Sequence, residues 1–128
     1  MTDNLRDVRR NRGAVSYQAG LSAEDRISTD YERRGFPVAQ RRWRGKGGEI
    51  DLIAQNGDGL VFIEVKQSSS FDQAVQHVSP RQMKRLYASA EEYLAQMPNG
   101  SLTDVRFDVA LVNGRGEVQV IENAFGHG

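Results

Sequence analysis

The sequence predicts an α/β domain with a mixed sheet of about five strands and flanking helices, in the order αβββαββ. Two turns rich in Asn and Gly, at residues 56–59 and 113–116, each join two apolar, β-branched segments. Between these two hairpins lies one long stretch with helical spacing of apolar residues, at 80–97. The 128 residues are enough for one such domain.

The first helix is predicted over residues 22–34. Ser22 is a suitable N-cap, with Asp25 three positions later, and Gly35 stands where a left-handed C-terminal cap belongs. The polar residues before this helix show neither helical nor strand periodicity. We therefore predict a flexible basic arm over residues 1–20, a folded domain over 21–123 and a flexible Gly-rich end over 124–128.

The strands follow from their composition and the turns between them. Residues 36–44 suit an extended segment with a proline near its start. Residues 49–55 and 60–67 form the most clearly predicted hairpin, and residues 104–112 and 117–122 form a second one.

The second helix is predicted to begin after Ser79, with Pro80 at its first position and Gln82 at its third. Its apolar residues recur at spacings of three and four and form one buried stripe. Pro98 and the following Asn and Gly are expected to stop it. The serines at 68–70 are predicted to lie in a loop.

Composition excludes several classes of small protein. The chain has no cysteine, so a disulfide framework, a thiolate zinc site and a cysteine nucleophile are all excluded. No stretch approaches the roughly 20 apolar residues of a membrane span, and no secretory signal is recognisable at the N-terminus. We therefore expect a cytoplasmic protein with no membrane partner.

The formal net charge of zero conceals an uneven distribution. Residues 1–48 carry eleven basic and six acidic side chains (net +5), and residues 49–128 carry six basic and eleven acidic ones (net −5). Charge asymmetry of this kind is one indication of nucleic-acid binding, so overall neutrality does not argue against a polyanionic partner.

The first hairpin brings acidic residues together. If its turn closes with either a two-residue or a four-residue loop, Asp51 lies opposite Glu64, and Glu49 lies opposite Lys66. Three carboxylates and an ammonium group would then cluster on one face of the hairpin. Because opposed acids repel, a divalent cation bridging Asp51 and Glu64 would offset the cost of placing them among apolar neighbours.

Only oxygen ligands are available there, and these suit Mg²⁺ or Mn²⁺. The alternative is a set of solvated charges at a strand end, with Glu49 and Lys66 as an ordinary cross-strand ion pair. Spacing alone leaves both interpretations open.

The same segments carry a resemblance to known proteins. Residues 48–53 (GEIDLI), 62–66 (FIEVK) and 106–109 (RFDV) resemble the YraN-like family of uncharacterised bacterial proteins. Through that family, the chain resembles the PD-(D/E)xK nuclease superfamily, which includes restriction endonucleases and Holliday-junction resolvases. The resemblance covers about residues 21–112 and implies a restriction-endonuclease-like three-layer fold.

The resemblance also implies roles for individual residues. It implies metal ligation by Asp51, Glu64 and the carbonyl group of Val65, and assigns Lys66 to orienting or activating the attacking water. A catalytic glutamate of the first helix matches Glu24. Where the family has Thr-Arg after the lysine, this chain has Gln67-Ser68, so one phosphate-binding arginine is absent.

Two further groups of residues complete the candidate site. Arg106 and Asp108 share a strand face and, with Glu49, are interpreted as support for the site. Residues 33–46 hold six basic residues and no acidic one. Within them, we predict phosphate contacts or base stacking by Arg41, Arg42, Trp43, Arg44 and Lys46. The alternative is a solvated strand face with the tryptophan in the core.

These observations lead to three hypotheses. The first is a Mg²⁺- or Mn²⁺-dependent endonuclease that hydrolyses branched or single-stranded DNA rather than RNA. The second is a nucleic-acid-binding protein that keeps the nuclease fold without activity. The third is a structural or protein-interaction domain, which requires neither a metal nor a nucleic acid. The superfamily resemblance also makes a homodimer plausible, because paired cuts need two active sites.

Overall fold

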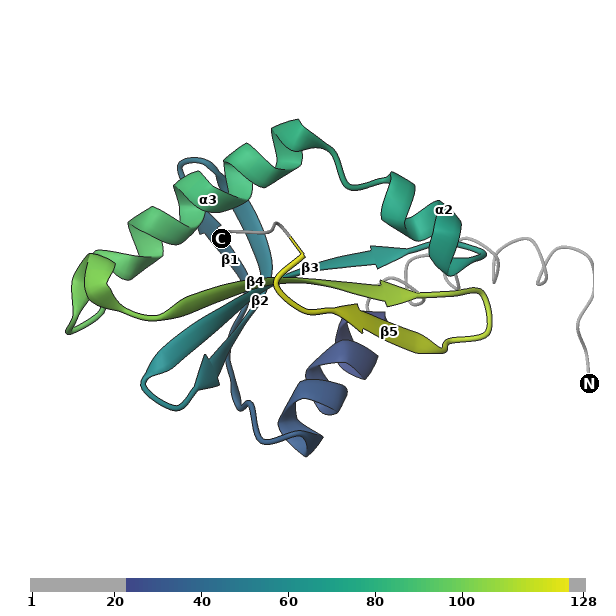
Figure 1. Ribbon diagram of the computed structural model, residues 1–128, viewed down its shortest axis with the longest axis horizontal. Coiled ribbons are helices and arrows are strands. Elements are labelled where there is room, and N and C mark those ends of the chain that lie inside the picture. The colour runs from purple at the N-terminus through teal and green to yellow at the C-terminus, as the bar shows by residue number, and fades with distance from the viewer. Residues whose placement is uncertain (1–22, 125–128) are drawn as a thin grey trace, which may run out of the picture.

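The computed structural model describes residues 23–124, in which a five-stranded sheet is flanked by helices on both faces (Figure 1). The arm predicted for residues 1–20 and nearly all of the end predicted for 124–128 lie outside the described residues. The described chain has the predicted α/β class, and its strands and two longer helices follow the predicted order.

The sheet has the strand order β1-β2-β3-β4-β5. Its strands are β1 (Val38–Gly45), β2 (Gly48–Asn56), β3 (Gly59–Gln67), β4 (Val105–Val112) and β5 (Val118–Ile121). Strands β3 and β4 pair in parallel, and the other neighbours are antiparallel. The sheet is therefore mixed, because the chain between β3 and β4 crosses over the sheet through helices.

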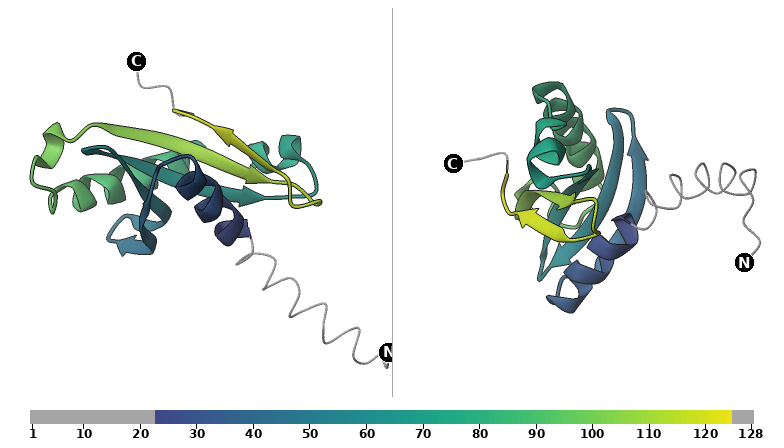
Figure 2. Two further views of the ribbon diagram at one scale, coloured as in Figure 1. Left: turned by 90° about the horizontal axis from the view of Figure 1, so that it is seen from below. Right: turned by 90° about the vertical axis from the view of Figure 1, so that its right-hand side faces the viewer.

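Helices cover the two faces of the sheet separately (Figures 1 and 2). The helix over residues 23–33 packs on one face, where Ile27 and Tyr31 contact alternate residues of the central strands. Helix α3 (Pro80–Leu94) covers the other face through Leu86, Ala90 and Tyr93. Successive residues of β3 thus face the first helix and α3 in turn, which explains why this strand is apolar on both sides.

The turn chemistry agrees with the sequence prediction. Asn56 pairs with Gly59, so the first hairpin closes through a two-residue loop, and Gly57 has a φ of 61°. Gly35 has a φ of 93° directly after the first helix. Both glycines adopt the left-handed conformation that side chains with a Cβ disfavour.

Some boundaries differ from the prediction. A six-residue helix, α2 (Phe71–Gln76), precedes α3 in a segment for which no helix or strand was predicted. Its buried residue, Ala74, packs against β4. Helix α3 ends at Leu94, before Pro98, and a 3₁₀ turn (Gly100–Leu102) follows. Among the helices in the described part of the chain, none has both the length and the apolar character needed to span a bilayer.

We expect Ser79→Ala to destabilise the domain by about 1 kcal/mol, because Ser79 Oγ accepts a hydrogen bond from the backbone N–H of Gln82 at 3.2 Å. In a domain of this size, that corresponds to a lower melting temperature by roughly 4–8 °C. Ser101→Ala is the matched control, since Ser101 is exposed in the 3₁₀ turn. Equal melting temperatures for the two variants would contradict the assigned cap.

Candidate active site

The predicted pair of carboxyl groups forms at the end of the first hairpin. The β2–β3 register runs from Asn56↔Gly59 to Leu52↔Ile63, as predicted. The next residue, Asp51, accepts a hydrogen bond from the backbone N–H of Val65 through Oδ2, at 2.8 Å. Its carboxyl group also hydrogen-bonds with that of Glu64. The side chain of Asp51 is therefore held between the two strands, beside the second acid.

The environment of Glu64 favours the protonated form of its carboxyl group. Burial, followed by the hydrogen bond and the charge of Asp51, raises the pKa of Glu64 to about 8, while Lys66 acts in the opposite direction. Without a cation, Glu64 is therefore mostly protonated at neutral pH. A divalent cation would replace that proton and neutralise both groups, which is the behaviour of a metal-binding carboxylate pair.

Lys66 is oriented by a residue that sequence reasoning did not single out for the site. The side-chain amide of Gln82 lies 2.9 Å from Lys66 Nζ and 2.7 Å from the carbonyl oxygen of His77. With its oxygen toward the lysine, the amide accepts from Lys66 and donates to His77. Gln82 is known from the sequence only as a helix-start residue, and its second role arises where α3 packs over the end of β3.

A small cavity lies beside the carboxyl pair. It measures about 170 Å³ and is lined by Gly48, Glu49, Glu64, Gln82, Arg85 and Leu86. Two strand acids and two polar residues of α3 therefore face the same space. Arg85 was also missed by sequence reasoning, because only the packing of α3 on the hairpin brings it here.

Glu49 does not complete a three-carboxylate cluster. Its carboxylate lies 3.5 Å from the guanidinium group of Arg44, and its effect on the pKa of Glu64 is the last of the causes. Within residues 23–124, no three His, Asp or Glu side chains are placed to hold a metal ion together. Glu49 thus pairs with Arg44 instead of joining the other two acids. The candidate metal ligands are therefore the carboxylates of Asp51 and Glu64 and a backbone oxygen. Such a set fits Mg²⁺, which is commonly bound through one or two carboxylates and several waters.

Glu24 is held by an arginine of β1. Arg42 Nε lies 3.1 and 3.0 Å from the two carboxylate oxygens of Glu24, whose side chain is only 13% exposed. Arg42 has a φ of 52° and lies between the pairs Arg41↔Leu52 and Trp43↔Ile50, which places it across from Asp51 along the strand. A non-glycine residue in this conformation is strained, and such residues concentrate at functional sites.

The three arginines of β1 are paired with acids, and the tryptophan among them packs against the core. Arg41 pairs with Asp25 at 2.7 Å, Arg42 with Glu24 and Arg44 with Glu49. Trp43 packs edge-to-face on Tyr93, with ring centroids 5.2 Å apart, against the core cluster beneath α3. Trp43 is therefore partly buried beside the core. The Arg41–Asp25 and Arg44–Glu49 pairs are exposed and hence weak, so phosphate could compete for these two arginines. Lys46 lies at the tip of the β1–β2 hairpin, and its side chain is exposed.

Arg106 and Asp108 form a buried ion pair on the other face of the sheet. Asp108 accepts two hydrogen bonds from Arg106 at 2.9 Å, one from the Tyr31 hydroxyl at 2.6 Å and one from the backbone N–H of Asn123 at 2.9 Å. Burial and the bond to Asp108 raise the pKa of Tyr31, which keeps its hydroxyl protonated.

This ion pair faces away from the carboxyl pair. Asp108 pairs with Ile63, the residue before Glu64, and successive residues of a strand point to opposite faces. Arg106 and Asp108 therefore attach the first helix and the C-terminal segment to the sheet and point away from the carboxyl pair.

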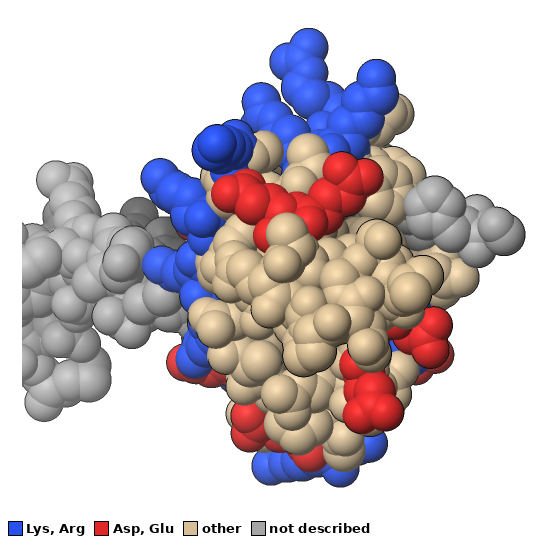
Figure 3. All heavy atoms as spheres, turned by 90° about the vertical axis from the view of Figure 1, so that its left-hand side faces the viewer, with Lys and Arg blue, Asp and Glu red and all other residues tan. Residues whose placement is uncertain are grey.

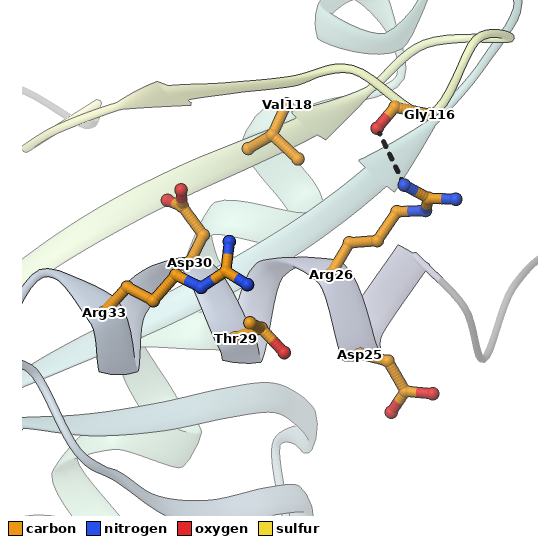
Figure 4. A pocket seen from close by; sticks show the side chains of 7 residues that line it. All are labelled: Asp25, Arg26, Thr29, Asp30, Arg33, Gly116 and Val118. Atoms are coloured by element: carbon orange, nitrogen blue, oxygen red, sulfur yellow. Dashed lines mark hydrogen bonds between the residues drawn. The ribbon is translucent and has the colours of Figure 1, made fainter.

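A larger hollow of about 470 Å³ lies between the first helix and the β4–β5 turn (Figure 4). Arg26 reaches across it and donates to the carbonyl oxygen of Gly116 at 3.4 Å. Both acids of its lining, Asp25 and Asp30, are paired with arginines that do not line it. It shares no lining residue with the cavity beside Glu64 and brings together no candidate catalytic group, so we take the smaller cavity as the candidate site.

Comparison with known proteins shows clear relatives. The family model described as "Uncharacterised protein family UPF0102" matches residues 23–112. A UPF0102 protein of Ruegeria pomeroyi is 56% identical over 118 residues, which is 92% of this chain and 96% of that protein. One from Cereibacter sphaeroides is 56% identical over 113 residues (88% and 97%), and one from Dinoroseobacter shibae is 41% identical over 119 residues (93% and 89%). The matched range contains every catalytic and metal-binding residue that the sequence predicted.

Proposed function

The chain belongs to the uncharacterised protein family UPF0102, and we propose from the site itself that it is a Mg²⁺- or Mn²⁺-dependent endonuclease that hydrolyses phosphodiester bonds of DNA. The observation that carries this proposal is the Asp51–Glu64 carboxyl pair, with Lys66 following on the same strand. The resemblance to the PD-(D/E)xK superfamily supports it. Branched and single-stranded DNA are the proposed substrates, in a cytoplasmic setting.

Each residue has a defined task in this proposal. Asp51, Glu64 and the carbonyl group of Val65 would hold the ion, which, when bound, polarises the phosphoryl group and acidifies a water. Lys66, oriented by Gln82, holds the attacking water and offsets the negative charge that grows on the phosphate. Arg42 and Glu24 fix the strand across from Asp51. Cutting both strands of a duplex would need two such sites, so a homodimer belongs to the proposal for duplex substrates.

The second candidate is a nucleic-acid-binding protein without hydrolytic activity. The observation that favours it is the incomplete acid set, because Glu49 pairs with Arg44 instead of joining Asp51 and Glu64. Gln67-Ser68, in place of the family's Thr-Arg, agrees with this candidate. It predicts binding that is sensitive to salt and indifferent to chelator.

A cleavage panel separates the two candidates. The full chain is incubated with linear duplex, single-stranded, nicked and four-way DNA, each with Mg²⁺, Mn²⁺ or EDTA, and the products are resolved on denaturing gels. The proposal expects cleavage of at least one form with a divalent cation and none with EDTA. Binding without cleavage of any form under all conditions would replace it with the second candidate.

The pKa of Glu64 predicts how stability depends on pH. A carboxyl group whose pKa rises to about 8 on folding stabilises the protein most below its unfolded pKa, and this contribution is lost as the pH rises to 8. Between about pH 4.5 and pH 8, the free energy of unfolding of the metal-free protein should therefore fall by up to about 1.4 kcal/mol per pH unit because of Glu64. Glu64→Gln should flatten the dependence, and Glu91→Gln, an exposed change on α3, should not.

Mg²⁺ or Mn²⁺ should raise the melting temperature more at pH 8.5 than at pH 6, because protons compete with the ion at the lower pH. Thermal melts in EDTA and in 10 mM cation provide the measurement. A cation effect that is equal at both pH values, or that persists in Glu64→Gln, would argue against ion binding at this pair.

A further inference from the structure

The tip of the β1–β2 hairpin is fastened to α3. Ser89 Oγ donates to the carbonyl oxygen of Gly48 at 2.8 Å, and the backbone N–H of Lys46 donates to Glu92 Oε2 at 2.7 Å. A Cβ atom at Gly47 would lie 2.9 Å from Cβ of Ala88, so the two segments are in direct contact. The hairpin tip and the helix therefore form one continuous rim above the cavity that Glu64 lines.

Arg85 lies on this rim, one turn of α3 before Ser89. It lines the cavity together with Glu64 and Gln82, and its Cβ and Cδ lie 4.0 Å from the position of a Cβ at Gly48. Among the described residues, no acidic group pairs with Arg85, in contrast to the arginines of β1. Its guanidinium group is thus available at the opening of the candidate site.

Two more cations precede Arg85 on the exposed side of α3. Arg81 is one turn earlier and Lys84 is the preceding residue; both are exposed, and the described chain places no acid against either one. Figure 3 shows Lys and Arg side chains gathered at the top of the molecule, where α3 and the β1–β2 turn lie in Figure 1. The helix therefore adds a basic surface that the sequence-based prediction, which considered only residues up to 46, did not contain.

We propose that Arg81, Lys84 and Arg85, here called the α3 cations, bind the phosphate backbone of the nucleic acid at the candidate active site, with Arg85 contacting the phosphate nearest to Glu64. For its substrate, this inference rests on the proposed function. It assigns the main phosphate-binding surface to α3 rather than to β1. Arg85 thereby supplies from a helix the positive charge that Gln67-Ser68 lack after Lys66.

The chemistry favours a polyanion over a single small anion. The α3 cations extend over more than one helical turn, and Lys46 is exposed at the hairpin tip that forms part of the same rim. Successive phosphates of one strand can engage such a row, whereas an isolated phosphate can occupy only one position. Arginine also matches phosphate oxygens with two parallel N–H donors, so Arg85 is suited to fix the phosphate at the cavity.

The test compares binding and cleavage in separate assays. Binding of fluorescein-labelled single-stranded and four-way DNA is measured by anisotropy in EDTA at 50 and 150 mM salt, and cleavage is measured with Mn²⁺. The variants are Arg85→Ala, Arg85→Lys and the triple alanine change of the α3 cations, with Arg115→Ala as the matched control in the exposed β4–β5 turn. Melting temperatures check that each variant is folded.

We expect the triple change to weaken single-strand binding at least about 30-fold and to reduce the slope of log K against log salt by roughly 2, with Arg115→Ala unchanged. Arg85→Ala should weaken binding about 5-fold, and Arg85→Lys should restore part of the loss. Unchanged binding by a folded triple variant, or no binding by the wild type, would overturn the inference. If the triple variant loses binding but the wild type cleaves nothing, the α3 surface is supported and the nuclease proposal fails.

Discussion

Asp51→Asn is expected to abolish DNA cleavage, by at least about 10³-fold, while leaving binding in EDTA within about 2-fold of the wild type. The loss follows because an amide cannot provide the charge that a divalent cation needs. Asparagine is a cleaner change than alanine, since its Oδ1 can still accept from the backbone N–H of Val65, as Oδ2 of Asp51 does at 2.8 Å. Alanine would leave that N–H unsatisfied, at a cost of about 1–3 kcal/mol.

The measurement is single-turnover cleavage with Mn²⁺ of whichever DNA form the panel identifies. Asp58→Asn, in the exposed turn of the same hairpin, is the matched control and should cleave like the wild type. Lys66→Ala should also lose cleavage, with binding largely retained. Full activity of Asp51→Asn would remove this pair from the mechanism, and loss of binding together with cleavage would indicate a structural role.

Asp108→Ala is expected to have the largest effect on stability, about 3–5 kcal/mol. The substitution leaves the guanidinium group of Arg106, whose side chain is 22% exposed, without its buried partner. It also removes the acceptor for the Tyr31 hydroxyl and for the backbone N–H of Asn123. In a domain of this size, the melting temperature should fall by roughly 12 °C or more.

Urea denaturation and thermal melts would measure this loss. Asp104→Ala, an exposed change just before β4, should leave stability within about 0.5 kcal/mol of the wild type. Tyr31→Phe removes only one bond to the carboxylate and should cost about 1.5–3 kcal/mol. If Asp108→Ala cost no more than Tyr31→Phe, the carboxylate would not be the centre of this network.

The parts of the fold that were predictable from sequence depend on local chemistry. Asn56 and Gly57 close a tight turn whatever surrounds them, and that turn sets the register that brings Asp51 to Glu64. Ser79 and Pro80 likewise mark the start of α3 without reference to other segments. The short helix α2 was missed because six residues carry too little periodicity, and its stability comes from burying Ala74 against β4.

The charges of the site were less predictable because their partners are distant in sequence. Arg41 and Arg42 appear free of acids within residues 33–46, yet the preceding helix supplies Asp25 and Glu24 to them. Gln82 and Arg85 acquire their positions only when α3 packs over the hairpin. Pairing with acids of other elements, rather than residue type, thus distinguishes the arginines of β1 from Arg85.

The two-residue turn of the first hairpin has a consequence for the order of folding. Asp51 and Glu64 are joined through a tight local turn, whereas Gly48 and Ser89 are 41 residues apart and meet only after a long loop has closed. The hairpin can therefore form before α3 arrives, and it then holds two mutually repelling acids without the nearby cations of the helix. A proton or a divalent ion on the pair would offset this repulsion at that stage, so the ion that we propose for the reaction would also assist the chain in folding.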